Sequence, residues 1–117
     1  MPDNVVIYHN PRCSKSRQTL ELLRKRGIEP KVVEYLKDPP SASRIKELIG
    51  LLGIAPAELV RTKEVPFEKH RLGKESSADA VATAIAADPI LLERPVVVVG
   101  QRAVIGRPPE NVLALLR

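Results

Sequence analysis

The segment 9–17 holds the side chains best suited to chemistry, and at its centre is Cys13, the only cysteine among 117 residues. A short apolar run over 5–8 precedes this segment and predicts a buried strand. Leucines at helical spacing follow it and predict a helix that begins near Ser14 or Ser16, both good capping residues. We therefore expect Cys13 at or just before the N-terminus of a helix.

This position favours a reactive thiolate at Cys13. The unpaired N–H groups and the positive dipole end of a helix N-terminus stabilise a negatively charged sulfur. Four nearby side chains add positive charge: His9, Arg12, Lys15 and Arg17. A free thiol has a pKa of about 8.5, and such surroundings lower it to roughly 3.5–7.5. The alternative is a small apolar filler in the core, which the polar and cationic neighbours disfavour.

Spacing excludes two other kinds of cysteine loop. Phosphatases that bind phosphate on a cysteine loop need five residues between the cysteine and an arginine, whereas three separate Cys13 from Arg17. A redox Cys-x-x-Cys pair needs a second cysteine at the position of Ser16. Cys13 is therefore expected to act without a disulfide partner in its own loop.

Composition narrows the classes of partner. The net charge of +5 suits an anionic substrate or an acidic partner, and the low aromatic content of 3% disfavours single-stranded nucleic acid. We see neither a signal peptide nor an apolar stretch long enough for a membrane span, and a lone cysteine indicates a reducing, cytoplasmic compartment. We predict no bound metal and no resident cofactor.

The order of elements predicts the fold class. After the first strand and helix, residues 31–35 form a second strand that should run parallel to the first. A strand over 95–99 and a second over 103–105 form a hairpin, and a last helix begins at Pro108 or Pro109. This order is typical of an α/β, thioredoxin-like fold, a four-stranded mixed sheet with helices on both faces.

The middle of the chain reads as a helical insertion in a single domain, 1–117. The thioredoxin-like core is expected over 3–37 and 93–117, and the insertion over 38–92. Within the insertion, the mixed and charged stretch around His70 is expected to be exposed.

Three arginines lie at the predicted ends of elements: Arg61, Arg94 and Arg107. Their planar guanidinium groups give bidentate contacts to tetrahedral oxyanions, so they are candidates for a shared anion site. Thioredoxin-like proteins carry a cis-proline before the third strand, packed against the active cysteine, and Pro95 stands at that point. We hypothesise that the bond before Pro95 is cis.

Three segments in this order closely resemble the glutaredoxin-coupled arsenate reductase family over nearly the whole chain: HNPRCSKSR at 9–17, ERPVVV at 93–98 and IGRPPE at 105–110. The resemblance implies that Cys13 is the nucleophile and that Arg61, Arg94 and Arg107 bind the oxyanion. Supporting roles are expected for His9, Asn10, Ser16, Arg17 and Pro95. His9 either tunes the Cys13 thiolate or is a polar loop residue that hydrogen-bonds the backbone.

The resemblance also implies a covalent mechanism. Cys13 would attack arsenate, glutathione would add as co-substrate, and glutaredoxin would remove the glutathione as arsenite forms. A chain without a second cysteine needs such external thiols. The alternative is a thiol protein of the same fold, a glutathione-accepting or protein-binding regulatory module that does not reduce arsenate. Nucleic-acid binding is not expected, because no recognised motif accompanies the positive charge.

Overall fold

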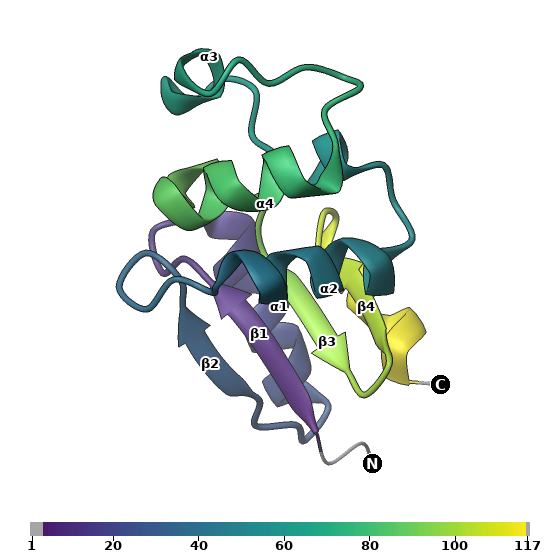
Figure 1. The fold of residues 1–117 in the computed structure, drawn as a ribbon. Coiled ribbons are helices and arrows are strands. Elements are labelled where there is room, and N and C mark those ends of the chain that lie inside the picture. Colours follow the sequence, from purple (N-terminus) through teal and green to yellow (C-terminus); the bar gives the residue numbers. More distant parts are fainter. Residues whose placement is uncertain (1–3, 117) are drawn as a thin grey trace. The chain divides into compact units, whose positions relative to one another are not determined.

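Four short strands form one mixed sheet in this computed structural model, which describes residues 4–116 (Figure 1). The strand order is β2-β1-β3-β4. β1 (Val5–His9) pairs in parallel with β2 (Lys31–Glu34) and antiparallel with β3 (Val96–Val99), and β3 pairs antiparallel with β4 (Arg102–Ile105). The predicted four-stranded mixed sheet is confirmed.

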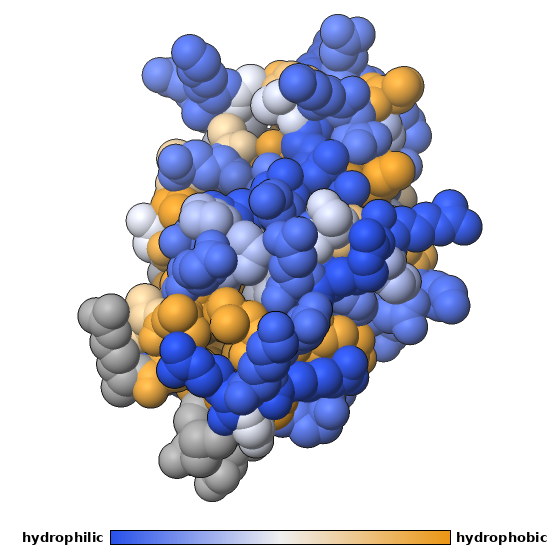
Figure 2. All heavy atoms as spheres, turned by 180° about the vertical axis from the view of Figure 1, so that it is seen from behind, coloured by the Kyte–Doolittle hydropathy of each residue, from blue (hydrophilic) through white to orange (hydrophobic). Residues whose placement is uncertain are grey.

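Two helices cover one face of this sheet. α1 (Ser14–Lys25) connects β1 to β2, and the 3-10 helix η3 (Pro109–Leu116) follows β4 and packs beside α1 (Figure 1). Figure 2 shows the molecule from this side, with hydrophobic side chains reaching the surface between hydrophilic ones over α1 and η3. The buried core beneath them consists of Val5, Ile7, Leu20, Leu23, Ile28, Val97, Val112 and Leu115.

The N-cap of α1 is Cys13 itself. The prediction that Ser14 or Ser16 caps this helix is therefore wrong. The hydroxyl of Ser16 instead accepts a hydrogen bond from the Asn10 N–H at 3.0 Å, so it serves the preceding loop. The expectation that Cys13 lies at the helix N-terminus is confirmed.

The chain divides into two compact units, one formed by residues 4–38 and 94–116 and the other by 39–93. The second unit contains two longer helices, α2 (Ala42–Leu52) and α4 (Ala78–Ala87), which pack against each other. Three short helices complete it: η1 (Pro56–Leu59), α3 (Pro66–Lys69) and η2 (Pro89–Leu91).

Local capping explains where the two longer helices begin and where α2 ends. The hydroxyls of Ser41 and Ser77 accept hydrogen bonds from backbone N–H groups three residues later, both at 3.1 Å. Gly53 ends α2 in the left-handed conformation, with φ of 64°, which glycine adopts without steric cost. Serine and glycine at these positions are the signals from which both helices are predictable.

The charged stretch around His70 is more ordered than the sequence indicates. It contains α3, and the His70 ring bonds through Nε2 to Oδ2 of Asp88 at 2.7 Å, which ties α3 to the end of α4. The His70 side chain is partly buried, with 21% of its surface accessible. Within residues 4–116, no helix is both long and apolar enough to cross a membrane.

Candidate active site

Strand register brings the candidate residues of the first unit to one edge of the sheet. Tyr8, near the end of β1, pairs with Val96 at the start of β3, and Val96 also pairs with Ile105 at the end of β4. The loop after β1, the residues before β3 and the residues after β4 therefore meet at the same edge. These three segments carry Cys13, Arg94 and Arg107 respectively.

The loop before α1 is held by its own backbone and by two of the predicted supporting residues. The Cys13 N–H donates to the Asn10 carbonyl at 3.0 Å, and the Asn10 side-chain oxygen accepts from the Arg12 N–H at 2.9 Å. The Arg17 guanidinium donates to the Pro11 carbonyl at 2.9 Å. Asn10 and Arg17 thus fix the loop that presents Cys13.

His9 contacts Ser16. Its Nδ1 lies 2.6 Å from the Ser16 hydroxyl oxygen, and both side chains are buried. Burial lowers the pKa of His9, although Glu34 opposes the shift, so the ring is largely neutral at pH 7. A neutral ring adds no positive charge to the thiolate. His9 is the last residue of β1, and its ring contacts a side chain and not the backbone, so this contact does not confirm the polar loop residue; tuning of Cys13 by His9 stays a prediction.

The thiol of Cys13 is half-buried and favours ionisation. Burial by itself raises its pKa, but the backbone N–H groups of Ser16 and Lys15 and the Arg94 guanidinium outweigh that effect and lower it overall. Negative charge at this sulfur is thus stabilised both by the first turn of α1 and by an arginine distant in sequence.

We expect this shift to be measurable as the pH dependence of alkylation. The rate of reaction of Cys13 with iodoacetamide should rise with pH and level off with a midpoint below the ordinary thiol value of about 8.5. The same chain unfolded in urea serves as the control and should show the ordinary midpoint. Equal midpoints for the folded and unfolded chain would contradict the stabilised thiolate.

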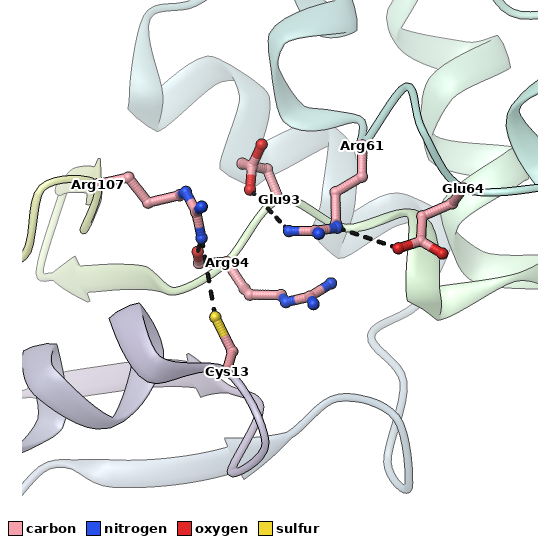
Figure 3. A network of polar contacts seen from close by, with 6 residues as sticks. All are labelled: Cys13, Arg61, Glu64, Glu93, Arg94 and Arg107. Carbon is pink, nitrogen blue, oxygen red and sulfur yellow. Dashed lines mark hydrogen bonds and ion pairs between the residues drawn. The ribbon is translucent and has the colours of Figure 1, made fainter.

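Arg107 points toward Cys13 in Figure 3, and the Arg94 guanidinium lies near enough to the sulfur to lower the pKa of the thiol. Nη1 of Arg107 lies 3.8 Å from the Cys13 sulfur and donates to the Arg94 carbonyl at 3.2 Å. Asn111 donates from its side chain to the Arg107 carbonyl at 3.1 Å. The site therefore combines a thiol of lowered pKa with two guanidinium groups, an arrangement able to bind a small oxyanion beside the sulfur.

The segment that carries Arg107 is packed tightly against the residue before β3. The Arg94–Pro95 peptide bond is cis, as hypothesised, and the Arg107–Pro108 bond, for which the sequence offered no signal, is cis as well. The Gly106 N–H donates to the Pro95 carbonyl at 2.8 Å. The Thr19 hydroxyl of α1 approaches the Gly106 carbonyl at 3.3 Å. The backbone contacts of Gly106 therefore fix the position of the next residue, Arg107.

Gly106→Ala is expected to disturb this packing. A Cβ at this position would lie 2.7 Å from Oγ1 of Thr19 and 2.9 Å from Cγ of Pro95, so backbone or side chains must shift. Such overpacking lowers the free energy of unfolding by roughly 1–3 kcal/mol, measurable by urea denaturation. Gly50→Ala is the matched control, because it lies inside α2 with open space around its Cβ and should be neutral or stabilising.

Arg61 belongs to the second unit. Its backbone N–H donates to the Leu91 carbonyl at 2.8 Å. Its guanidinium pairs with Glu64 and with Glu93, both at 3.4 Å, as Figure 3 shows. These carboxylates hold the side chain in one orientation. A role of Arg61 in binding the oxyanion stays a prediction.

Five residues that contact or lie near the candidate site residues were not predicted as such: Tyr35, Thr19, Gly106, Glu64 and Glu93. Gly106 carried a signal, since it precedes the Arg-Pro-Pro segment, whereas burial of Tyr35 and Thr19 depends on packing that no local pattern encodes. Among residues 4–116, we find no cluster of three or more His, Cys, Asp or Glu side chains arranged to hold a metal ion.

Fold and site together define a thioredoxin-like protein with a single cysteine at a helix N-terminus, flanked by two arginines. The chain belongs to the ArsC family, which it matches over residues 8–115.

Similar proteins span the whole chain. It is 45% identical to an arsenate reductase of Neisseria meningitidis serogroup A, covering 99% of this chain and 100% of that one. It is 48% identical to an Escherichia coli K12 protein named YfgD and described as uncharacterized, covering 99% of each. Among solved structures, the arsenate reductase from Vibrio cholerae aligns with a TM-score of 0.90 at 45% identity, over 97% of this chain and 98% of that one.

Proposed function

We propose that this protein reduces arsenate to arsenite through a covalent bond between Cys13 and arsenic, with glutathione as co-substrate and glutaredoxin as partner. The observation that carries the proposal is the position of the Cys13 sulfur, at the N-terminus of α1 and 3.8 Å from the Arg107 guanidinium. The lowered thiol pKa and the relatives named arsenate reductase add support.

In the first step, the Cys13 thiolate attacks the arsenic atom of arsenate. A sulfur–arsenic bond forms, an arsenic–oxygen bond breaks, and the oxygen leaves as water after protonation, so arsenic stays pentavalent. Arg94 and Arg107 donate hydrogen bonds to the remaining oxygens and offset their negative charge as the sulfur approaches. Arg61 is the third proposed oxyanion residue.

The two electrons for reduction come from external thiols, because the chain contains only one cysteine. The glutathione thiol bonds to arsenic and releases a second water. A glutaredoxin thiolate then attacks the glutathione sulfur, and the electron pair of the sulfur–arsenic bond stays on arsenic, which becomes trivalent. Glutathione and glutaredoxin leave as a mixed disulfide, and hydrolysis of the bond to Cys13 releases arsenite.

A coupled assay tests this proposal. Purified protein is mixed with arsenate, glutathione, glutaredoxin, glutathione reductase and NADPH, and the oxidation of NADPH is followed. We expect turnover that disappears when arsenate, glutathione or glutaredoxin is omitted. An inactive protein whose Cys13 still titrates with a lowered pKa would contradict arsenate reduction and favour a glutathione-accepting or protein-binding module.

A further inference from the structure

Tyr35 is a fully buried residue at the same sheet edge as the Cys13 loop. It directly follows β2, and the register of β2 with β1 pairs Glu34 with His9, so Tyr35 comes level with Asn10. Its hydroxyl is buried and forms no hydrogen bond of good geometry with any residue that the structure describes. A buried hydroxyl without a hydrogen-bond partner lowers the stability of the fold, so we looked for a function that offsets this cost.

The groups around the hydroxyl limit what it can do. Burial raises the pKa of Tyr35, while the Arg94 guanidinium and the Asn10 side chain lie close enough to oppose that shift. The Asn10 side-chain oxygen already accepts from the Arg12 N–H at 2.9 Å. A guanidinium group has only donors, so the phenol oxygen can serve Arg94 only as an acceptor.

We propose that Tyr35 is a positioning residue that holds the Arg94 guanidinium toward Cys13 through its buried hydroxyl oxygen. Hydrogen bonds at active sites are often poorly aligned before substrate binds and tighten in the complex. The hydroxyl oxygen is buried, so it acts on the guanidinium and not on the substrate. In the arsenate reaction, this inference rests on the proposed role of Arg94 as an oxyanion donor.

The test is a double-mutant cycle of Tyr35→Phe and Arg94→Ala, read out on Cys13 without turnover. The first measurement is the pH midpoint of alkylation, which needs no oxyanion. Tyr35→Phe should raise the alkylation midpoint, and Arg94→Ala should raise it further. The double variant should have the same midpoint as Arg94→Ala alone, because the hydroxyl then has no guanidinium to position. The phenylalanine ring keeps the packing, so the thermal midpoint should stay close to the wild-type value.

The second measurement is protection of Cys13 from alkylation by arsenate. Tyr35→Phe should need about tenfold more arsenate for the same protection, a loss of ~1.4 kcal/mol. Wild-type protein that arsenate does not protect would count against the proposed function, while the alkylation midpoint would still decide the role of Tyr35. Midpoints unchanged by Tyr35→Phe, or shifted equally with and without Arg94, would overturn the positioning role.

Discussion

Cys13→Ser is expected to lower arsenate-dependent oxidation of NADPH to the level measured without the protein. A serine hydroxyl is hardly ionised at neutral pH and is a much weaker nucleophile than a thiolate, so the covalent bond to arsenic does not form. Loss of a nucleophile in a catalytic unit lowers kcat by more than about 10³-fold. The same coupled assay measures this loss.

Ser14→Ala is the matched control for this variant. Ser14 is the first residue of α1, next to Cys13, and its side chain is exposed. The backbone N–H groups that face the sulfur come from Ser16 and Lys15, and they are unchanged in this variant. Ser14→Ala should therefore keep wild-type turnover. Activity retained in Cys13→Ser would rule out a covalent intermediate at this sulfur.

Arg107→Ala is expected to weaken arsenate binding and to slow the step at sulfur. The variant loses a guanidinium whose Nη1 lies 3.8 Å from the Cys13 sulfur. A hydrogen bond to a charged group contributes about 1.5–3 kcal/mol, so kcat/KM for arsenate should fall roughly 10- to 100-fold or more. Steady-state kinetics at varied arsenate concentration measure this change.

Two further variants separate charge from geometry. Arg26→Ala removes the same charge at the C-cap of α1, away from Cys13, and should leave kcat/KM for arsenate unchanged. Arg107→Lys keeps the charge but loses the planar fork, so it should recover only part of the activity. Equal losses in Arg26→Ala and Arg107→Ala would mean that net charge, and not the contact at Cys13, controls the rate.

Much of the local structure follows from the sequence. Ser41, Gly53 and Ser77 mark helix ends because capping depends on one residue and its nearest neighbours. The expected position of Cys13 at the start of α1 rests on the same local logic, since a loop containing Pro11 separates an apolar strand from a helical stripe. The order of these elements also predicts the mixed sheet.

The pairing of polar side chains does not follow from local signals. Ser16 is a good capping residue by type, yet its hydroxyl bonds with His9 and Asn10, and Cys13 takes the cap. His70 is expected at the surface from its charged neighbours, and its ring bonds to Asp88, eighteen positions later in the sequence. Each outcome depends on which of several possible partners the folded chain brings within bonding distance.

The strands, the longer helices and the position of the single cysteine at a helix N-terminus were predictable from the sequence alone, because they depend on neighbours in the chain. The contact of Arg107 with the sulfur of Cys13, ninety-four positions away, depends instead on the folded chain. The pairing of β1, β3 and β4 sets that contact, and register is a property of the whole sheet. The burial of Tyr35 beside Arg94 has the same origin, because it arises from packing between segments that are distant in the sequence.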